Sequence, residues 1–174
     1  MYQGVMAMNI FVIGKSKTGK TTVSSKIAQA LDIQHVTVST IFREIVNEND
    51  FETRQEFIEK ISYVSETMIE HDPYVVVNYV NSMTANTSSV VEGFRNPFEF
   101  IKIFNPSEDK VVFLNGGKHV LSYQSKFENG VDLIYKNLKW MHDLKILKNF
   151  VEFKYNNWEE LNQQIKDYIK NFQF

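Results

Sequence analysis

The residues with the clearest chemical meaning lie near the amino end, in a loop rich in glycine and lysine. Residues Gly14–Thr21 read Gly-Lys-Ser-Lys-Thr-Gly-Lys-Thr, which matches G-x-x-x-x-G-K-[ST], and they follow the apolar run Ile10–Ile13. Apolar residues then recur at helical spacing across Val23–Leu31. A strand, a glycine-rich loop and a helix in this order turn backbone N–H groups onto the phosphates of a nucleotide, and the helix dipole adds positive potential. The pattern therefore predicts a phosphate-binding loop.

Individual residues of this loop have distinct predicted roles. Lys20 is expected to reach the β- and γ-phosphates and to act in catalysis, while the Thr21 hydroxyl is expected to sit on Mg²⁺. The predicted cofactor is therefore Mg²⁺, with ATP as co-substrate. The residues predicted to bind ATP are Gly14, Lys17, Thr18, Gly19, Lys20, Thr21 and Thr22.

A carboxylate is expected to complete the metal site. The short apolar run Ser89–Glu92 ends in an acid, and a carboxylate at the end of a strand beside the phosphate-binding loop can hold Mg²⁺ through water. Because Glu92 leads directly into Gly93-Phe94-Arg95, we interpret it as a metal ligand rather than as a solvated acid. The N/T-K-x-D motif that reads guanine is absent from the sequence, which argues against a GTP-binding switch.

Arginine is scarce, and its positions are informative. Of the 19 lysines and arginines, only Arg43, Arg54 and Arg95 are arginine. The planar guanidinium group binds two phosphate oxygens at once, which lysine cannot do. Arg43 and Arg95 follow the second and third predicted strands, at the edge where ligands bind in such sheets. We therefore expect both to bind an anionic acceptor such as a monophosphate, whereas Arg54, in a charged helical stretch, fits an acceptor contact and a surface role equally well.

The elements that must position these residues form a regular alternation. Because strand-like runs alternate with helical patterns, the sequence predicts a three-layer α/β fold, with a five-stranded parallel sheet and helices on both faces. We expect a single domain over residues 1–174. The predicted strands are Asn9–Ile13, Gln34–Val38, Ser89–Glu92, Lys110–Leu114 and Phe150–Phe153.

Two longer connections could hold substrate. Residues 39–84 are predicted to form a helical acceptor-binding insertion, with Asp72-Pro73 starting its last helix. Residues 115–129 are polar, contain Gly116-Gly117 and are predicted to form a short lid. The helices expected in the insertion are Thr40–Asn47, Glu52–His71 and Pro73–Met83.

Composition limits the possible partners. The formal net charge is -2, so no basic field indicates nucleic acid as a main partner. The chain has no cysteine, and no apolar run approaches the roughly 20 residues of a membrane helix. Residues Met1–Met8 do not resemble a signal peptide. We expect a cytoplasmic protein that binds nucleotide substrates and no membrane, and the oligomeric state stays open.

Three segments together resemble the adenylate kinase-like nucleoside monophosphate kinases, which carry the P-loop NTPase fold. These are Ile10–Thr22, His35–Arg43 and Val90–Arg95. The stretch Val91–Glu99, with Arg95-Asn96 followed by Glu99, looks more like bacteriophage-type deoxynucleoside monophosphate kinases and dephospho-coenzyme A kinases. The resemblance implies transfer of the γ-phosphoryl group of ATP to a nucleoside or deoxynucleoside monophosphate. It also implies that Arg43 and Arg95 bind the acceptor phosphate, with Arg95 taking part in catalysis. Ser39 would then line the acceptor pocket, with Arg54 as a further contact.

The sequence also departs from the family pattern. Glu92 replaces the usual aspartate, and no arginine follows Arg95, although the lid of the family supplies arginines to the transferring group. Lys118 and Lys126 could substitute as point charges. Two alternatives therefore stay open: a nucleotide-binding regulatory protein with little catalysis, and a kinase for dephospho-coenzyme A or another phosphorylated metabolite.

Overall fold

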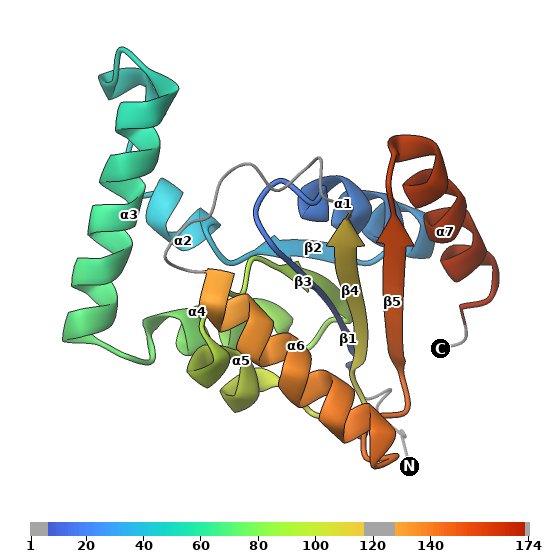
Figure 1. Ribbon diagram of the computed structural model, residues 1–174. Helices are drawn as coiled ribbons and strands as arrows, with labels where there is room; N and C mark the ends of the chain where they lie inside the picture. Colours follow the sequence, from blue (N-terminus) through green and yellow to red (C-terminus); the bar gives the residue numbers. More distant parts are fainter. Residues whose placement is uncertain (1–6, 117–127, 173–174) are drawn as a thin grey trace.

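Five parallel strands form the framework of the protein (Figure 1). The computed structural model describes residues 7–116 and 128–172. The strands lie in the order β2-β3-β1-β4-β5, so the first strand is central and its neighbours come from later in the chain. The predicted five-stranded parallel sheet is confirmed. The strands are β1 (Asn9–Gly14), β2 (Gln34–Thr37), β3 (Ser89–Glu92), β4 (Lys110–Gly116) and β5 (Phe150–Tyr155).

Helices cover both faces of the sheet, as the sequence predicts. Alternate residues of a strand point to opposite faces, so Ile10 and Val12 of β1 join one core cluster while Phe11 and Ile13 join the other. The first cluster packs against α1 (Lys20–Leu31) and α7 (Trp158–Lys170). The second packs against three helices, which are α4 (Val75–Thr84), α5 (Pro97–Ile103) and α6 (Glu128–Asp143).

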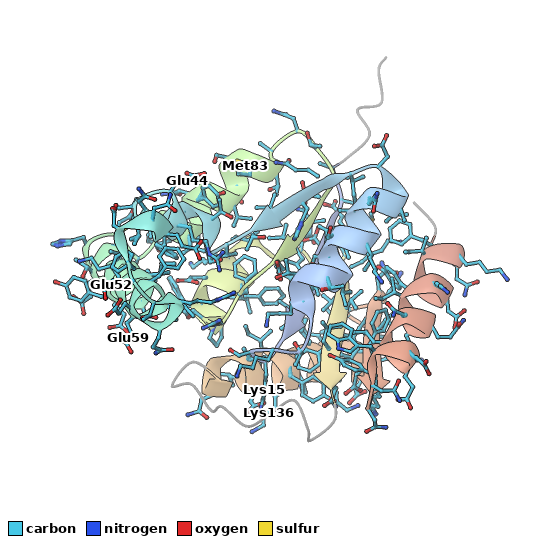
Figure 2. The ribbon with its side chains drawn as sticks, turned by 90° about the horizontal axis from the view of Figure 1, so that it is seen from above. Lys15, Glu44, Glu52, Glu59, Met83 and Lys136 are labelled. Carbon is cyan, nitrogen blue, oxygen red and sulfur yellow. The ribbon has the colours of Figure 1, made fainter. Side chains whose placement is uncertain are left out.

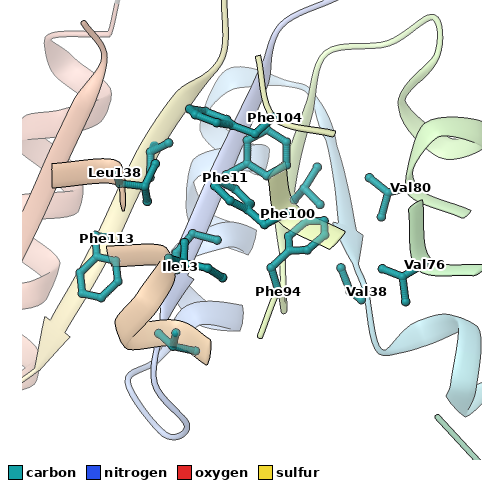
Figure 3. Close-up of a cluster of buried hydrophobic side chains, with 14 of the residues drawn as sticks. Phe11, Ile13, Val38, Val76, Val80, Phe94, Phe100, Phe104, Phe113 and Leu138 are labelled. Atoms are coloured by element: carbon teal, nitrogen blue, oxygen red, sulfur yellow. The ribbon is translucent and has the colours of Figure 1, made fainter. Parts of the chain in front are cut away.

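Four phenylalanines at the centre of the second cluster hold the segment that follows β3 (Figure 3). The ring of Phe11 lies 5.8 Å from Phe94, 5.4 Å from Phe100 and 5.8 Å from Phe104, measured between centroids. Phe94 is 1% exposed and directly precedes Arg95. Burial of this ring therefore fixes the main chain from which Arg95 projects.

The connection between β2 and β3 has two parts with different packing. It contains α2 (Thr40–Arg43), a 3-10 turn (Glu48–Asp50), α3 (Arg54–His71) and α4. Val76 and Val80 place α4 in the core, whereas α3 stands apart from the sheet and buries only Phe57 fully (Figure 1). The part of residues 39–84 that extends away from the sheet is therefore α3.

All three helices of this connection have boundaries that differ from those predicted, and α3 begins at Arg54 rather than Glu52. Asp72-Pro73 does not begin α4: Asp72 caps the carboxyl end of α3, its side chain accepts the N–H of Tyr74, and α4 begins at Val75. The helix predicted over Thr40–Asn47 ends at Arg43, and Asn47 belongs to a separate 3-10 turn, where its side chain accepts the N–H of Asn49. Most of the predicted lid, residues 117–127, lies outside the described residues, and its flanks belong to β4 and α6.

A buried acid lies in α5, four residues after Arg95. Glu99 is 4% exposed, and its Oε1 has no hydrogen-bond partner among the described residues. Burial raises the pKa of Glu99 to about 7, although a hydrogen bond with Asn96 opposes this rise. Between pH 4.5 and about 7, the folded protein therefore keeps a proton on Glu99 that the unfolded chain releases.

We expect Glu99→Gln to stabilise the protein more at pH 8 than at pH 5. Because the folded-state pKa is raised, ionised Glu99 weakens folding as the pH rises through this window, and glutamine carries no charge. The gain in unfolding free energy should be about 1–3 kcal/mol larger at the higher pH. Urea denaturation at both pH values measures it, with exposed Glu70→Gln as the control. An equal gain at both pH values would contradict the assignment.

Candidate functional site

Three segments meet where the carboxyl ends of β2, β3 and β1 lie side by side. Thr37 and Val12 both pair with Glu92, so the ends of all three strands lie level at this edge of the sheet. The phosphate-binding loop follows β1, Ser39 and α2 follow β2, and Arg95 follows β3. The arrows of β4 and β5 point upward in Figure 1, and Figure 2 shows the protein from above. The fold therefore brings most of the predicted site residues to one edge.

The loop after β1 is tightly closed on itself. The Lys15 carbonyl accepts the hydroxyl of Thr18 at 2.8 Å and the ammonium of Lys20 at 2.6 Å. A Cβ atom at Gly14 would lie 2.8 Å from the Thr18 hydroxyl, and Gly19 has a φ of +82°, a conformation that favours glycine. Glycine is thus required at both positions by the shape of the loop.

Three later elements support the loop from outside. The Tyr155 hydroxyl, at the end of β5, donates to the Thr18 carbonyl. The Trp158 ring, at the start of α7, would lie 2.9 Å from a Cβ atom at Gly19. Lys15, labelled in Figure 2 beside α6, forms a 3.0 Å ion pair with Asp132 of that helix. The conformation of the loop therefore depends on residues more than 100 positions away.

Glu92 is a buried carboxylate that stays ionised. It is 2% exposed, and its Oε1 accepts the Thr37 hydroxyl at 3.2 Å and lies 3.4 Å from Nε2 of His35. Burial by itself would raise the pKa of Glu92. Hydrogen bonds from His35 and Thr21, together with the charges of His35 and Lys20, outweigh burial, and the pKa lies below its ordinary value.

The side chains of Thr21 and Glu92 fit a magnesium ion. The Thr21 hydroxyl is near enough to Glu92 to lower the pKa of that carboxyl, and both side chains present the oxygen donors that Mg²⁺ prefers. Among the described residues, no group of three or more histidines or acids could hold a metal ion alone. In the usual Mg²⁺ arrangement one or two protein ligands are completed by phosphate oxygens and water.

The four residues predicted to bind the acceptor come from three elements. Ser39 precedes α2 and Arg43 ends it, and the Val38 N–H donates to the Glu92 carbonyl at 2.9 Å, which ties this segment to β3. Arg95 is exposed and follows β3, the strand that neighbours β2 in the sheet. Arg54 differs, because it is the first residue of α3, the helix that stands apart from the sheet (Figure 1). The fold thus groups Ser39, Arg43 and Arg95 more closely with the loop than Arg54.

The main chain of Arg95 is held by a glycine of α6. A Cβ atom at Gly130 would lie 1.9 Å from the Arg95 carbonyl oxygen, which no side chain could accommodate without movement of the backbone. Residues 93–97 therefore pack directly on the first turns of α6. Lys118 and Lys126, the lysines predicted to replace lid arginines, lie outside the described residues.

The sequence does not reveal which partners several residues of the site contact, although His35 and Thr37 lie in the segment His35–Arg43 that carries the family resemblance. His35, Thr37 and Asp132 contact site residues across long distances in the chain, and Trp158 reads as an ordinary packing residue. Tyr155 offers one weak signal, because it is a polar-tipped aromatic at the end of the last strand. That position places it at the same edge as the loop once the sheet is known to be parallel.

Comparisons with known proteins agree with this geometry. The family model described as an AAA domain (AAA_18) matches residues 10–120. An adenylate kinase from Rickettsia bellii (strain RML369-C) is 24% identical over 119 residues, which cover 66% of this chain and 55% of that protein. This chain therefore spans about half the length of that relative.

A solved kinase structure shares the fold. The shikimate kinase from Acinetobacter baumannii, determined in complex with shikimate, superposes with a TM-score of 0.52 and 17% identity, covering 95% of this chain and 92% of that one. The dephospho-CoA kinase from Campylobacter jejuni gives a TM-score of 0.49 and 16% identity, covering 95% and 96%. The predicted resemblance to adenylate kinase-like P-loop kinases is confirmed by the family match, the adenylate kinase relative and the shared fold. No helix among residues 7–116 and 128–172 has the length and apolar character needed to cross a membrane.

We expect Gly130→Ala to destabilise the protein by about 1–3 kcal/mol, because the added methyl group must displace either α6 or the main chain of Arg95. Chemical denaturation measures this change. Asn129→Ala is the matched control, since Asn129 is an exposed neighbour on the same helix and its loss should stay within about 0.5 kcal/mol. Equal stability of the two variants would show that α6 does not pack against Arg95 in this way.

Proposed function

We propose that this chain, which belongs to the family described as an AAA domain, transfers the γ-phosphoryl group of Mg·ATP to a nucleoside or deoxynucleoside monophosphate. The observation that carries the proposal is the meeting of three features at one sheet edge. These are a closed phosphate-binding loop, an ionised carboxylate at Glu92, and the arginine-bearing segments that follow β2 and β3. Phosphoryl transfer needs this combination, because its catalysis rests on positioning and on fixed charge.

The residues of the loop bind and orient the nucleotide. Its backbone N–H groups and the amino end of α1 provide positive potential for the phosphates. Lys20, which donates to the Lys15 carbonyl in this structure, would exchange that carbonyl for β- and γ-phosphate oxygens. Gly14, Lys17, Thr18, Gly19 and Thr22 complete the proposed ATP site.

Thr21 and Glu92 would hold the metal ion. Bound Mg²⁺ bridges phosphate oxygens and neutralises the charge that develops on them during transfer. Thr37 and His35 contact Glu92, and His35 with Thr21 lowers its pKa, so that it presents a charged oxygen at this edge.

The acceptor phosphate would be bound near the sheet edge by Arg43 and Arg95, with Ser39 lining the pocket. Residues 44–72 do not favour an anion, because they carry nine acids against only Arg54 and Lys60. Figure 2 labels three of these acids on the side of α2 and α3. The positive charge for a phosphorylated acceptor must therefore come mainly from Arg43 and Arg95, with Arg54 as a peripheral contact. The acids are Glu44, Glu48, Asp50, Glu52, Glu56, Glu59, Glu66, Glu70 and Asp72.

The adenylate kinase relative supports a nucleoside monophosphate as acceptor. One feature favours a second candidate, a nucleotide-binding regulatory protein: no arginine follows Arg95 in the sequence. An arginine that reaches the transferring group can be worth roughly 10³-fold in rate. A kinase for dephospho-coenzyme A or another phosphorylated metabolite would use the same loop with a different acceptor.

We expect release of ADP from Mg·ATP to depend on at least one monophosphate and on Lys20. A coupled assay with all ribo- and deoxyribonucleoside monophosphates, dephospho-coenzyme A and shikimate identifies the acceptor. Lys20→Ala should abolish transfer, because it removes the charge at the β- and γ-phosphates. Tight binding of Mg·ATP without turnover on any acceptor would favour the regulatory protein instead.

We expect Arg95→Ala to impair use of the acceptor while leaving the affinity for ATP within about twofold. Loss of a bidentate phosphate contact should raise the acceptor KM or lower kcat by about tenfold or more. Steady-state kinetics with each substrate varied in turn separates the two effects. Lys166→Ala, which removes an exposed charge on α7, is the control. Unchanged acceptor constants in Arg95→Ala would remove Arg95 from the acceptor site.

A further inference from the structure

We propose that Tyr155 is a positioning residue for nucleotide binding: by holding the carbonyl of Thr18, it directs the N–H of Gly19 toward the bound phosphates. The inference rests on the proposed function only in assuming that nucleotide phosphates occupy the loop. It holds whether or not the chain transfers a phosphoryl group.

The contact between Tyr155 and Thr18 is enclosed. Tyr155 is 6% exposed and Thr18 is 2% exposed, and the phenol hydroxyl donates to the Thr18 carbonyl. The ring also lies against Gly116, where a Cβ atom would come within 3.0 Å of the hydroxyl. With water excluded, the loss of this donor would leave a buried carbonyl without its partner.

The geometry of the peptide bond passes this restraint to Gly19. The peptide that joins Thr18 and Gly19 is planar, and the described residues contain no cis peptide bond. In a trans peptide the carbonyl and the following N–H point in opposite directions. Holding the Thr18 carbonyl toward Tyr155 therefore points the Gly19 N–H away from β5.

Gly19 needs an external restraint because it lacks a side chain. Glycine adopts both signs of φ readily, so the peptide before Gly19 could rotate at little steric cost. Gly19 has a φ of +82°, and the Trp158 ring packs against its α-carbon. Trp158 limits where the α-carbon can move, whereas Tyr155 fixes which way the peptide faces.

The phenol remains a donor under physiological conditions. Burial raises the pKa of Tyr155 to about 12, although the hydrogen bond with Thr18 opposes this rise. The hydroxyl therefore keeps its proton throughout the neutral range.

Tyr168 provides a matched control on the same face of the sheet. It lies in the same core layer as Tyr155, with its ring 5.9 Å from that of Phe153. Its hydroxyl is buried and has no hydrogen-bond partner within residues 7–116 and 128–172. Tyr168→Phe thus removes a buried hydroxyl without removing a hydrogen bond.

The test compares the binding of Mg·ATP and of magnesium tripolyphosphate by calorimetry. Tripolyphosphate has no base or sugar, so its affinity reports the phosphate cradle alone. Tyr155→Phe should weaken both ligands by about three- to tenfold, and Tyr168→Phe should leave both unchanged. If Tyr155→Phe binds both ligands as tightly as the unaltered protein, the proposal is wrong.

A spectroscopic measurement tests the same proposal on the unaltered protein. Thr18-Gly19 is the only threonine–glycine pair in the sequence, so ¹³C-threonine with ¹⁵N-glycine labelling selects the Gly19 amide alone. Its proton resonance should move downfield on addition of magnesium tripolyphosphate. A Gly19 amide that does not respond while the ligand binds would overturn the proposal even where Tyr155→Phe does not fold. If no acceptor supports turnover in the kinase assay, the calorimetric and NMR measurements still test this proposal.

Discussion

The structure depends on one constraint: a loop that offers its N–H groups to a ligand must satisfy its carbonyls elsewhere. In a trans peptide each inward N–H implies an outward carbonyl, and an enclosed carbonyl without a partner is costly. Lys20 and the Thr18 hydroxyl satisfy the carbonyl of Lys15 from within the loop. Tyr155 satisfies that of Thr18 from the end of β5. The conformation of the loop Gly14–Thr21 is thus maintained partly by its own residues and partly by the last strand of the sheet.

The strand order explains why so distant a residue can act on the loop. β1 is central, with β3 on one side and β4 on the other, and β5 pairs with β4 up to Gly116 and Tyr155. This pairing carries Tyr155 to the same edge as the loop, and α7 then begins at Trp158 against Gly19. On the other side of β1, β3 ends at Glu92, and the segment with Arg95 follows it at the same edge of the sheet. The central position of β1 therefore lets both halves of the chain contribute to one site.

The sequence was sufficient to predict the features that depend on local pattern. The loop Gly14–Thr21 and the five apolar strands follow from motif and alternation, and the sheet confirms the strands. Contacts between distant single residues left no such pattern: Tyr155 is 137 positions from Thr18, and nothing near Asp132 marks it as a partner of Lys15. The predicted start of α4 was wrong for a local reason. Asp72 is the C-cap of α3, and its carboxylate accepts the N–H of Tyr74. An aspartate before proline fits either the end of one helix or the start of the next, and only the packing of α3 and α4 decides between them.

Two glutamates of the same region show why burial alone does not identify a functional acid. Glu92 and Glu99 are 2% and 4% exposed, and burial disfavours the charged form of each. Around Glu92, donors from His35 and Thr21 and the charges of His35 and Lys20 more than offset that effect, so its pKa falls. Around Glu99 only Asn96 opposes burial, and the pKa rises to about 7. A carboxylate that keeps its charge next to a hydroxyl is suited to a cation, whereas one that readily takes a proton is suited to a neutral interior. The partners supplied by β2 and α1, and not the depth of burial, are therefore what distinguish Glu92 as the metal-binding candidate.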